Sequence, residues 1–329
     1  MSVAFTKIIS GILSAIFAVM SFFSVNLNCH KRSDDVLFTV AAVSDTHMKD
    51  SAIRKLVADA CFNDITKTIA PDLLLVNGDL VDEAKPENYD ALKDSMQNYC
   101  GVENVLMTLG NHDTWGDYDT SHEYSSAREL WLEYTNELMK YQHDEVYYHY
   151  IQDGYHFIVL GSEGTSTAAR ISDDQIAWMD AQLEAAEADS EGKPVFVFLH
   201  QPMSYTHGVG ADDVDGDDEG FDEAAQSAKF QATLDKYPNI IYVSGHTHDA
   251  LNGGKLNGGE FATVEKVGEN ITSINLPSMM YFGWSGMGSH FLSGGGAVIN
   301  VYADRVEILG RNFLTRTWIS DVKVTVKLA

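Results

Sequence analysis

The sequence predicts an α/β fold, because short buried strands alternate with amphipathic helices and Asp, Asn or His side chains follow the strands. Five apolar runs end shortly before such a residue: Val36–Val43, Leu73–Val76, Val105–Leu109, Val195–Leu199 and Ile240–Val243. Near-continuous apolar strands separated by helices are typical of a mainly parallel sheet covered on both faces. Ligands bind such sheets at the carboxyl ends of the strands. The five strand ends therefore predict one shared ligand site.

Three helices are predicted between these strands. Apolar residues recur at helical spacing over residues 53–61. A second helix begins at Pro86 and ends near Cys100, since proline is favoured in the first turn and glycine follows the end. Ser172 and Gln175 form a capping box at the start of a third helix.

The last third of the chain has a different pattern, with strand-like segments and few helical signals. The segments are Ile271–Leu276, Ala297–Tyr302, Val306–Leu309 and Trp318–Leu328. We expect them to add antiparallel strands, so that two sheets pack together. No long linker divides the chain, so one domain over residues 35–329 is predicted, with a small separate C-terminal domain as the alternative.

The composition indicates a large, strongly acidic globular protein. The chain has 329 residues, 45% of them apolar, which is enough for a well-buried core. Asp and Glu number 48 against 22 Lys and Arg, giving a formal net charge of −26. Phosphate contacts of nucleic-acid-binding proteins need Lys and Arg. A nucleic-acid partner is therefore not expected.

The N-terminal segment, residues 1–29, has the pattern of an export signal. Lys7 is its only charged residue and precedes an apolar stretch from Ile8 to Phe23, which is short for a membrane span. We expect an exported protein, secreted or attached to the outer face of the cell membrane. A cleaved signal peptide and an uncleaved anchor are both open, and lipid attachment at Cys29 is a weaker alternative. An anchor would be the only membrane contact.

The other two cysteines, Cys61 and Cys100, each fall in a predicted helix. An oxidising compartment permits a disulfide between them. Buried free thiols are the preferred interpretation, and the redox state is left open.

The polar residues after the strands form five short motifs. In chain order they are Asp-x-His at Asp45, Gly-Asp-x-x-Asp at Gly78, Gly-Asn-His-Asp at Gly110, a single histidine at His200 and Gly-His-x-His at Gly245. Each motif alone is common, and a lone histidine after a strand is usually a satisfied polar residue. Their ordered combination on strand ends is specific.

This ordered set resembles the calcineurin-like metallophosphoesterases. The resemblance extends from Val36 to Asn312, and the segment Ser172–Ala186 resembles a helix of bacterial members. It implies a four-layer α/β/β/α sandwich, in which helices flank two mixed β-sheets. It also implies metal-dependent hydrolysis of a phosphoric ester by a hydroxide that bridges two metal ions.

The resemblance implies a ligand set for each of the two metals. Asp45, His47, Asp79 and His248 would hold the first metal, and Asp79, Asn111, His200 and His246 the second, with Asp79 bridging. Mixed imidazole and carboxylate ligands suit Mn, Zn, Fe or Co. Two such ions can stabilise the attacking and leaving oxygens of an in-line displacement at phosphorus.

Two further residues are implied to act in catalysis. The histidine matching His112 faces the substrate in the family, where it stabilises charge and can protonate the leaving oxygen. Asp82 would orient His112. The alternatives are a structural histidine and a loop-capping aspartate. Purple acid phosphatases resemble the family but have tyrosine at the position of Asp82, so a purple ferric site is not expected here.

A small phosphodiester is slightly favoured over a phosphomonoester as the substrate. Few basic residues lie near the motifs, and Arg170 and Lys255 are the nearest in sequence. A diester carries one charge less than a dianionic terminal phosphate, so two metals alone can neutralise it. A non-catalytic metal-bound scaffold and a nuclease are the alternatives. The physiological substrate and oligomeric state stay open.

Overall fold

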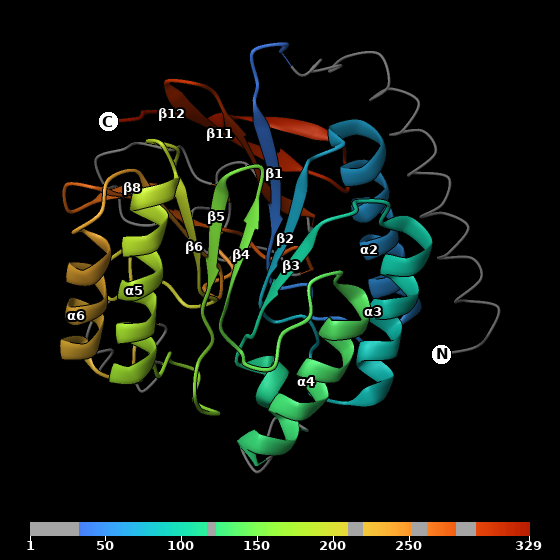
Figure 1. The fold of residues 1–329 in the computed structure, drawn as a ribbon. Coiled ribbons are helices and arrows are strands. Elements are labelled where there is room, and N and C mark those ends of the chain that lie inside the picture. The colour runs from blue at the N-terminus through green and yellow to red at the C-terminus, as the bar shows by residue number, and fades with distance from the viewer. Residues whose placement is uncertain (1–32, 117–122, 210–219, 250, 252–261, 281–293) are drawn as a thin grey trace, which may run out of the picture.

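The computed structural model describes residues 33–116, 123–209, 220–249, 251, 262–280 and 294–329. The predicted signal segment and Lys255 lie outside these residues. The described part forms two six-stranded sheets with helices outside them (Figure 1).

The first sheet has the strand order β12-β11-β10-β1-β2-β3. Its strands are β1 (Phe38–Val43), β2 (Leu73–Asn77), β3 (Val105–Thr108), β10 (Gly295–Val301), β11 (Arg305–Asn312) and β12 (Thr317–Lys327). β1, β2 and β3 run parallel, whereas β10, β11 and β12 form an antiparallel extension that begins beside β1. The last three predicted strands therefore share a sheet with β1, whereas the predicted strand Ile271–Leu276 belongs to the second sheet and runs parallel to its neighbour Ile240–Ser244 there.

The second sheet has the order β4-β5-β6-β7-β9-β8. Its strands are β4 (Tyr148–Gln152), β5 (Tyr155–Val159), β6 (Val195–Phe198), β7 (Ile240–Ser244), β8 (Val264–Val267) and β9 (Ile271–Asn275). The central four are parallel, and β4 and β8 are antiparallel at the two edges. Both sheets are therefore mixed.

Helices cover the outer face of each sheet. Beside the first sheet lie α2 (Ala52–Asp64), α3 (Pro86–Tyr99) and α4 (Tyr124–Leu138); beside the second lie α5 (Asp173–Asp189) and α6 (Ala224–Leu234) (Figure 1). The ring of Phe38 in β1 lies 4.7 Å from Tyr155 and 5.8 Å from Phe157 in β5, so the sheets pack on each other. These layers confirm the predicted α/β/β/α sandwich.

The predicted helices agree closely with the observed ones. Ser172 caps α5, where its Oγ accepts a hydrogen bond from the backbone N–H of Gln175 at 3.1 Å. Cys61 and Cys100 are free thiols. No helix within the described ranges combines the length and apolar character needed to cross a bilayer.

Candidate metal centre

The predicted ligands lie in the loops that follow five parallel strands. Asp45 and His47 follow β1, Asp79 follows β2, Asn111 follows β3, His200 follows β6, and His246 and His248 follow β7. Five of these residues have a left-handed backbone, with φ of 54° at Asp45, 38° at His47, 48° at Asp79, 73° at His246 and 53° at His248. Such strain in residues with side chains concentrates at functional sites, because the surrounding fold must impose it.

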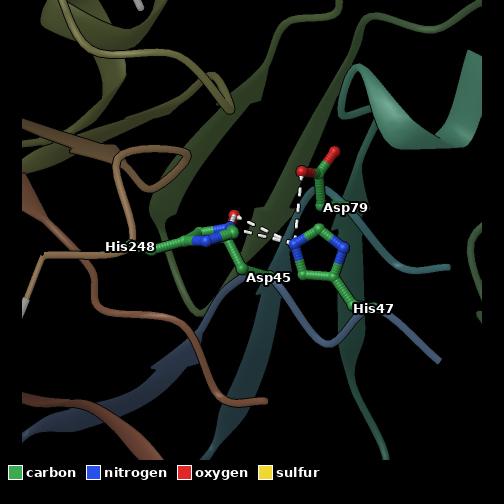
Figure 2. Close-up of side chains that lie close together, drawn as sticks. All are labelled: Asp45, His47, Asp79 and His248. Carbon is green, nitrogen blue, oxygen red and sulfur yellow. Dashed lines mark hydrogen bonds and ion pairs between the residues drawn. The ribbon is translucent and has the colours of Figure 1, made fainter. Parts of the chain in front are cut away.

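Asp45, His47, Asp79 and His248 form the first group of donors (Figure 2). His47 Nε2 lies 2.9 Å from His248 Nε2 and 3.6 Å from Asp79 Oδ2. His248 Nε2 lies 3.0 Å from Asp45 Oδ1. Donors around one transition metal stand about 3–3.6 Å apart, since each bond is about 2.0–2.2 Å long. His47 Nε2 and Asp45 Oδ1 are somewhat farther apart, at 3.8 Å, and the four donor atoms all lie within 4.8 Å of one another, close enough to surround one ion.

Asp79, His200 and His246 form a second group, with one donor atom from each within 4.8 Å of the others. Asp79 Oδ2 lies 3.2 Å from His200 Nε2 and is also the oxygen that faces His47. The same carboxylate oxygen thus stands between both groups. This is the place that a bridging ligand would take.

Two buried atoms of the predicted second ligand set support cation binding. Asn111 Oδ1 and His246 Nε2 are buried and accept no hydrogen bond from any residue that the structure describes. Buried polar atoms in proteins nearly always have a partner. The residues present therefore fit a pair of metal ions, for which these two atoms offer lone pairs.

The charges of the buried side chains also favour the binding of cations at the site. Burial disfavours the ionised form of Asp45, but the neighbouring His248 and His200 hold its pKa well below the usual value. Burial lowers the pKa of His200, but the carboxylates of Asp79 and Asp45 raise it by more, to about 10 overall. Burial, together with the nearby His200, lowers the pKa of His246 to about 3. Two buried carboxylates thus demand positive charge, which metal ions would supply.

The His200 ring is oriented by the first sheet. Its Nδ1 donates to the backbone carbonyl of Asn77 at 2.8 Å. Because Nδ1 keeps its proton for that bond, Nε2 is the nitrogen that can offer a lone pair to a metal.

His112 begins a short 3₁₀ turn, His112–Thr114, beside the first group. Its ring centroid lies 4.5 Å from that of His47, with the ring planes at 84°. The backbone N–H donates to Asp79 Oδ1 at 2.9 Å, and ring Nδ1 donates to the backbone carbonyl of Asp82 at 2.8 Å. Nε2 is therefore the ring nitrogen suited to exchange a proton with a substrate.

Asp82 contacts His112 through its backbone carbonyl, while its carboxylate faces His47. Asp82 Oδ1 lies 3.6 Å from His47 Nδ1 and 2.9 Å from Arg54 Nη1, and Oδ2 lies 3.2 Å from Lys49 Nζ. His47, Asp82 and His112 also form a three-residue group of potential metal ligands. The Asp82 carboxylate is already paired with two cations, so this group supports the other two instead of forming a third metal site.

Sequence reasoning missed three residues that shape the centre. Arg54 contacts the Asp82 carboxylate, and the Asp113 carboxylate accepts backbone N–H bonds from Leu80, Val81 and Gly110 at 3.2, 3.2 and 2.8 Å. The half-buried Trp115 ring lies 4.5 Å from His112, and its Nε1 donates to the Thr165 carbonyl at 2.9 Å. Only Asp113 had a sequence signal, as the last residue of Gly-Asn-His-Asp.

Comparison with known protein families gives one match over most of the chain. The family model described as calcineurin-like phosphoesterase matches residues 38–250. This range contains all seven predicted ligands and His112.

Two curated bacterial proteins are similar in sequence. One from Fibrobacter succinogenes, named a probable cyclic nucleotide phosphodiesterase, is 27% identical over 229 residues, which are 64% of this chain and 73% of the relative. One from Synechococcus, also named a probable cyclic nucleotide phosphodiesterase, is 26% identical over 232 residues, 68% of this chain and 78% of the relative.

Two solved structures have a similar fold. Purple acid phosphatase PPD1 from yellow lupin gives a TM-score of 0.61 at 10% identity over 88% of this chain, which spans about half (53%) of the lupin chain. GAP50 of Plasmodium, described as the anchor in the inner membrane complex, gives 0.55 at 15% identity over 88% of both chains. These likenesses extend to the fold alone.

Proposed function

The chain belongs to the calcineurin-like phosphoesterase family and is a metal-dependent phosphoric ester hydrolase. We propose that it acts on small phosphodiesters. The observation that supports a two-metal hydrolytic site is the Asp79 carboxylate, whose Oδ2 stands between His47 and His200. It allows one residue to serve both donor groups.

We assign the two donor groups to two metal ions. Asp45, His47, Asp79 and His248 would hold one ion, and Asp79, Asn111, His200 and His246 the other. Bound there, the pair would supply Lewis acidity and a bridging hydroxide nucleophile at neutral pH. Mn, Zn, Fe and Co all suit this donor set.

The chain's own residues would bind the ester and assist the departing group. We assign His112 as the proton donor to the leaving oxygen, and the Asp82 carbonyl supports this role because it holds Nδ1 and leaves Nε2 for the task. Trp115, next to the His112 ring, offers an aromatic face to the group attached to that oxygen. The planar base of a nucleoside leaving group fits this surface.

The charges around the site favour a diester. Lys49 and Arg54 both pair with Asp82, and Lys49 also lies 3.3 Å from Glu83 Oε1. These cations already compensate carboxylates of the protein. A diester has one charge less to neutralise than a dianionic monoester, so it depends less on further cations. The names of the two bacterial relatives support the same class, with cyclic nucleotides as candidates.

We also propose that the protein is exported, on the basis of Lys7 and the apolar stretch that follows it. Fractionation of cells that express the full chain tests this. A protein found only in the cytosol would contradict export without affecting the proposed activity.

The substrate proposal is tested with metal-stripped protein reconstituted separately with Mn²⁺, Zn²⁺, Fe²⁺ and Co²⁺. Each form is assayed with bis(p-nitrophenyl) phosphate, p-nitrophenyl phosphate and 3′,5′-cyclic AMP. We expect metal-dependent turnover with a higher kcat/KM for the diesters. A preference for the monoester would refute the substrate class. Tight binding of two metals without any turnover would indicate the non-catalytic alternative, and nicking of plasmid DNA at low salt would indicate a nuclease.

A further inference from the structure

We propose that Arg54 is a positioning residue, which fixes the Asp82 carboxylate and thereby aims both His47 and His112. Arg54 lies in the first turn of α2, the helix that follows the loop of Asp45 and His47. Its Nη1 donates to the backbone carbonyl of His47 and lies 2.9 Å from Asp82 Oδ1. One nitrogen thus ties the loop after β1 to the loop after β2.

Burial makes this contact energetically important. The Asp82 side chain is 1% exposed and Arg54 19%, whereas Lys49, the other partner of Asp82, is 40% exposed. A buried carboxylate whose partner is removed is costly, while an exposed ion pair contributes little. Arg54 is therefore the principal partner of Asp82, and Lys49 is secondary.

The oxygen that Arg54 holds is also the oxygen that faces the metal ligand. Asp82 Oδ1 lies 2.9 Å from Arg54 Nη1 and 3.6 Å from His47 Nδ1. The 3.6 Å between Asp82 Oδ1 and His47 Nδ1 is the distance of an ion pair and not of a hydrogen bond. A carboxylate that faces Nδ1 of a ligating histidine favours the tautomer and ring orientation in which Nε2 meets the metal. Movement of the carboxylate would thus turn the His47 ring.

Asp82 also contacts His112, the proposed proton donor, through its main chain. The Asp82 carbonyl accepts the bond from His112 Nδ1 at 2.8 Å. Displacement of Asp82 would therefore shift His47 and His112 together, although Arg54 has no role in the chemistry itself. Such a coupled effect distinguishes positioning from general stabilisation of the fold.

Arginine suits this task better than lysine. The N–H bonds of one guanidinium nitrogen point in fixed directions within a plane, so they can reach two acceptors at defined angles. A lysine would keep the charge near Asp82 without this geometry. We therefore expect the Arg54→Lys variant to recover only part of what Arg54→Met loses.

The test compares Arg54→Met and Arg54→Lys with Lys55→Met. Lys55 is the next residue of the same helix and forms a surface pair with Asp94 at 3.2 Å, so it is a matched control. Metal-stripped proteins are titrated with Mn²⁺ by calorimetry, and kcat and KM are measured with bis(p-nitrophenyl) phosphate at saturating Mn²⁺. We expect Arg54→Met to lose about 10–100-fold in affinity for one of two metals and in kcat, the usual effect of a partner behind a ligand. KM should change much less, and Lys55→Met should match the wild type.

A double mutant separates positioning from a structural role. If Arg54 acts through Asp82, Arg54→Met combined with Asp82→Asn should be no slower than Asp82→Asn alone. If the kcat losses of the two single variants multiply in the double mutant, the proposal is overturned. Wild-type kcat and Mn²⁺ affinity in Arg54→Met would also overturn it. If Arg54→Met does not fold, as judged by circular dichroism, Arg54→Lys gives the same comparison. The kcat arm rests on the proposed function. Mn²⁺ affinity is measured without substrate, so it would test Arg54 even if the wild type hydrolysed no ester.

Discussion

The two halves of the metal centre are built differently. The half that follows β1, β2 and β3 contains the buried carboxylates. Arg54 and Lys49 hold it by ion pairs with Asp82, and Asp113 holds the loop after Asp79 by accepting backbone hydrogen bonds. The half that follows β6 and β7 contains only histidines, and groups of the first sheet hold it. The Asn77 carbonyl accepts from His200, and Asp45 Oδ2 accepts the backbone N–H of His246 at 3.1 Å.

The difference follows from the cost of burying charge. Ionised carboxylates away from water need opposite charges and hydrogen bonds, so their half requires a network. A neutral imidazole needs one acceptor for its second nitrogen, which a backbone carbonyl provides. We therefore expect substitutions in the carboxylate half to act through charge, and substitutions near the histidine half to act through shape.

Removal of the shared carboxylate charge should have the largest effect. Asp79→Asn keeps the size of the side chain but leaves both donor groups without their common anion. We expect loss of most bound metal and of detectable turnover. Metal content by mass spectrometry and a phosphodiester assay check this. Retention of two metals per chain would show that Asp79 is not shared.

Replacement of the proton donor should slow turnover while metal binding persists. His112→Ala removes the ring but leaves the backbone N–H that donates to Asp79. We expect kcat to fall about 10²–10⁴-fold, the usual weight of a positioned proton donor. Assays at saturating metal, with metal content measured in parallel, give the result. Normal turnover would refute the role.

A change of shape in the histidine half should have a smaller effect. Gly78 has φ of 80°, and an added Cβ would lie 2.4 Å from His200 Nδ1. Gly78→Ala should displace His200, with about a 10–100-fold loss of affinity for one metal. Gly192 is a matched control, because its φ is 82° and a Cβ there would have no neighbour within 4 Å. Equal metal affinities in the two variants would show that backbone strain alone explains the result.

The smallest effect concerns pH and a histidine apart from both halves. Burial lowers the pKa of His143 below its ordinary value of 6.5, and its Nδ1 donates to the Glu145 carbonyl at 2.8 Å. The unfolded chain takes up this proton at higher pH than the folded one, so stability falls as pH drops below about 6.5. His143→Gln should flatten the pH dependence of the urea midpoint below about pH 6.5. An unchanged slope would assign the acid sensitivity to other groups.

The arrangement of the ligands can be predicted from the sequence better than their support can. Because motif order and strand ends are both visible in the chain, the sequence alone assigns Asp45, Asp79 and His200 to one site. Arg54 escapes such reasoning, since a helical arginine gives no sign of the loop that it contacts. The sequence assigned Asp82 to orient His112, and the two residues are in contact, but residue type could not tell that the backbone carbonyl makes the contact and the carboxylate faces His47.

The second sheet was predicted less completely than the first. The strands β6 and β7 are continuous apolar runs, whereas β4 is an edge strand of mostly half-buried residues, with Ile151 51% exposed. The capping box marked the start of α5, but α6, on the same sheet, begins at Ala224 without a side-chain cap. Elements without a local signal acquire their structure from tertiary packing.

Five ligand positions have a left-handed backbone: Asp45, His47, Asp79, His246 and His248. At these corners, the residue that is best for stability differs from the residue that is best for metal affinity. Glycine adopts that backbone without steric cost, but it has no donor atom. Libraries of this gene screened only for heat resistance should therefore accumulate glycine at these corners, and the enriched clones should fold well without holding metal.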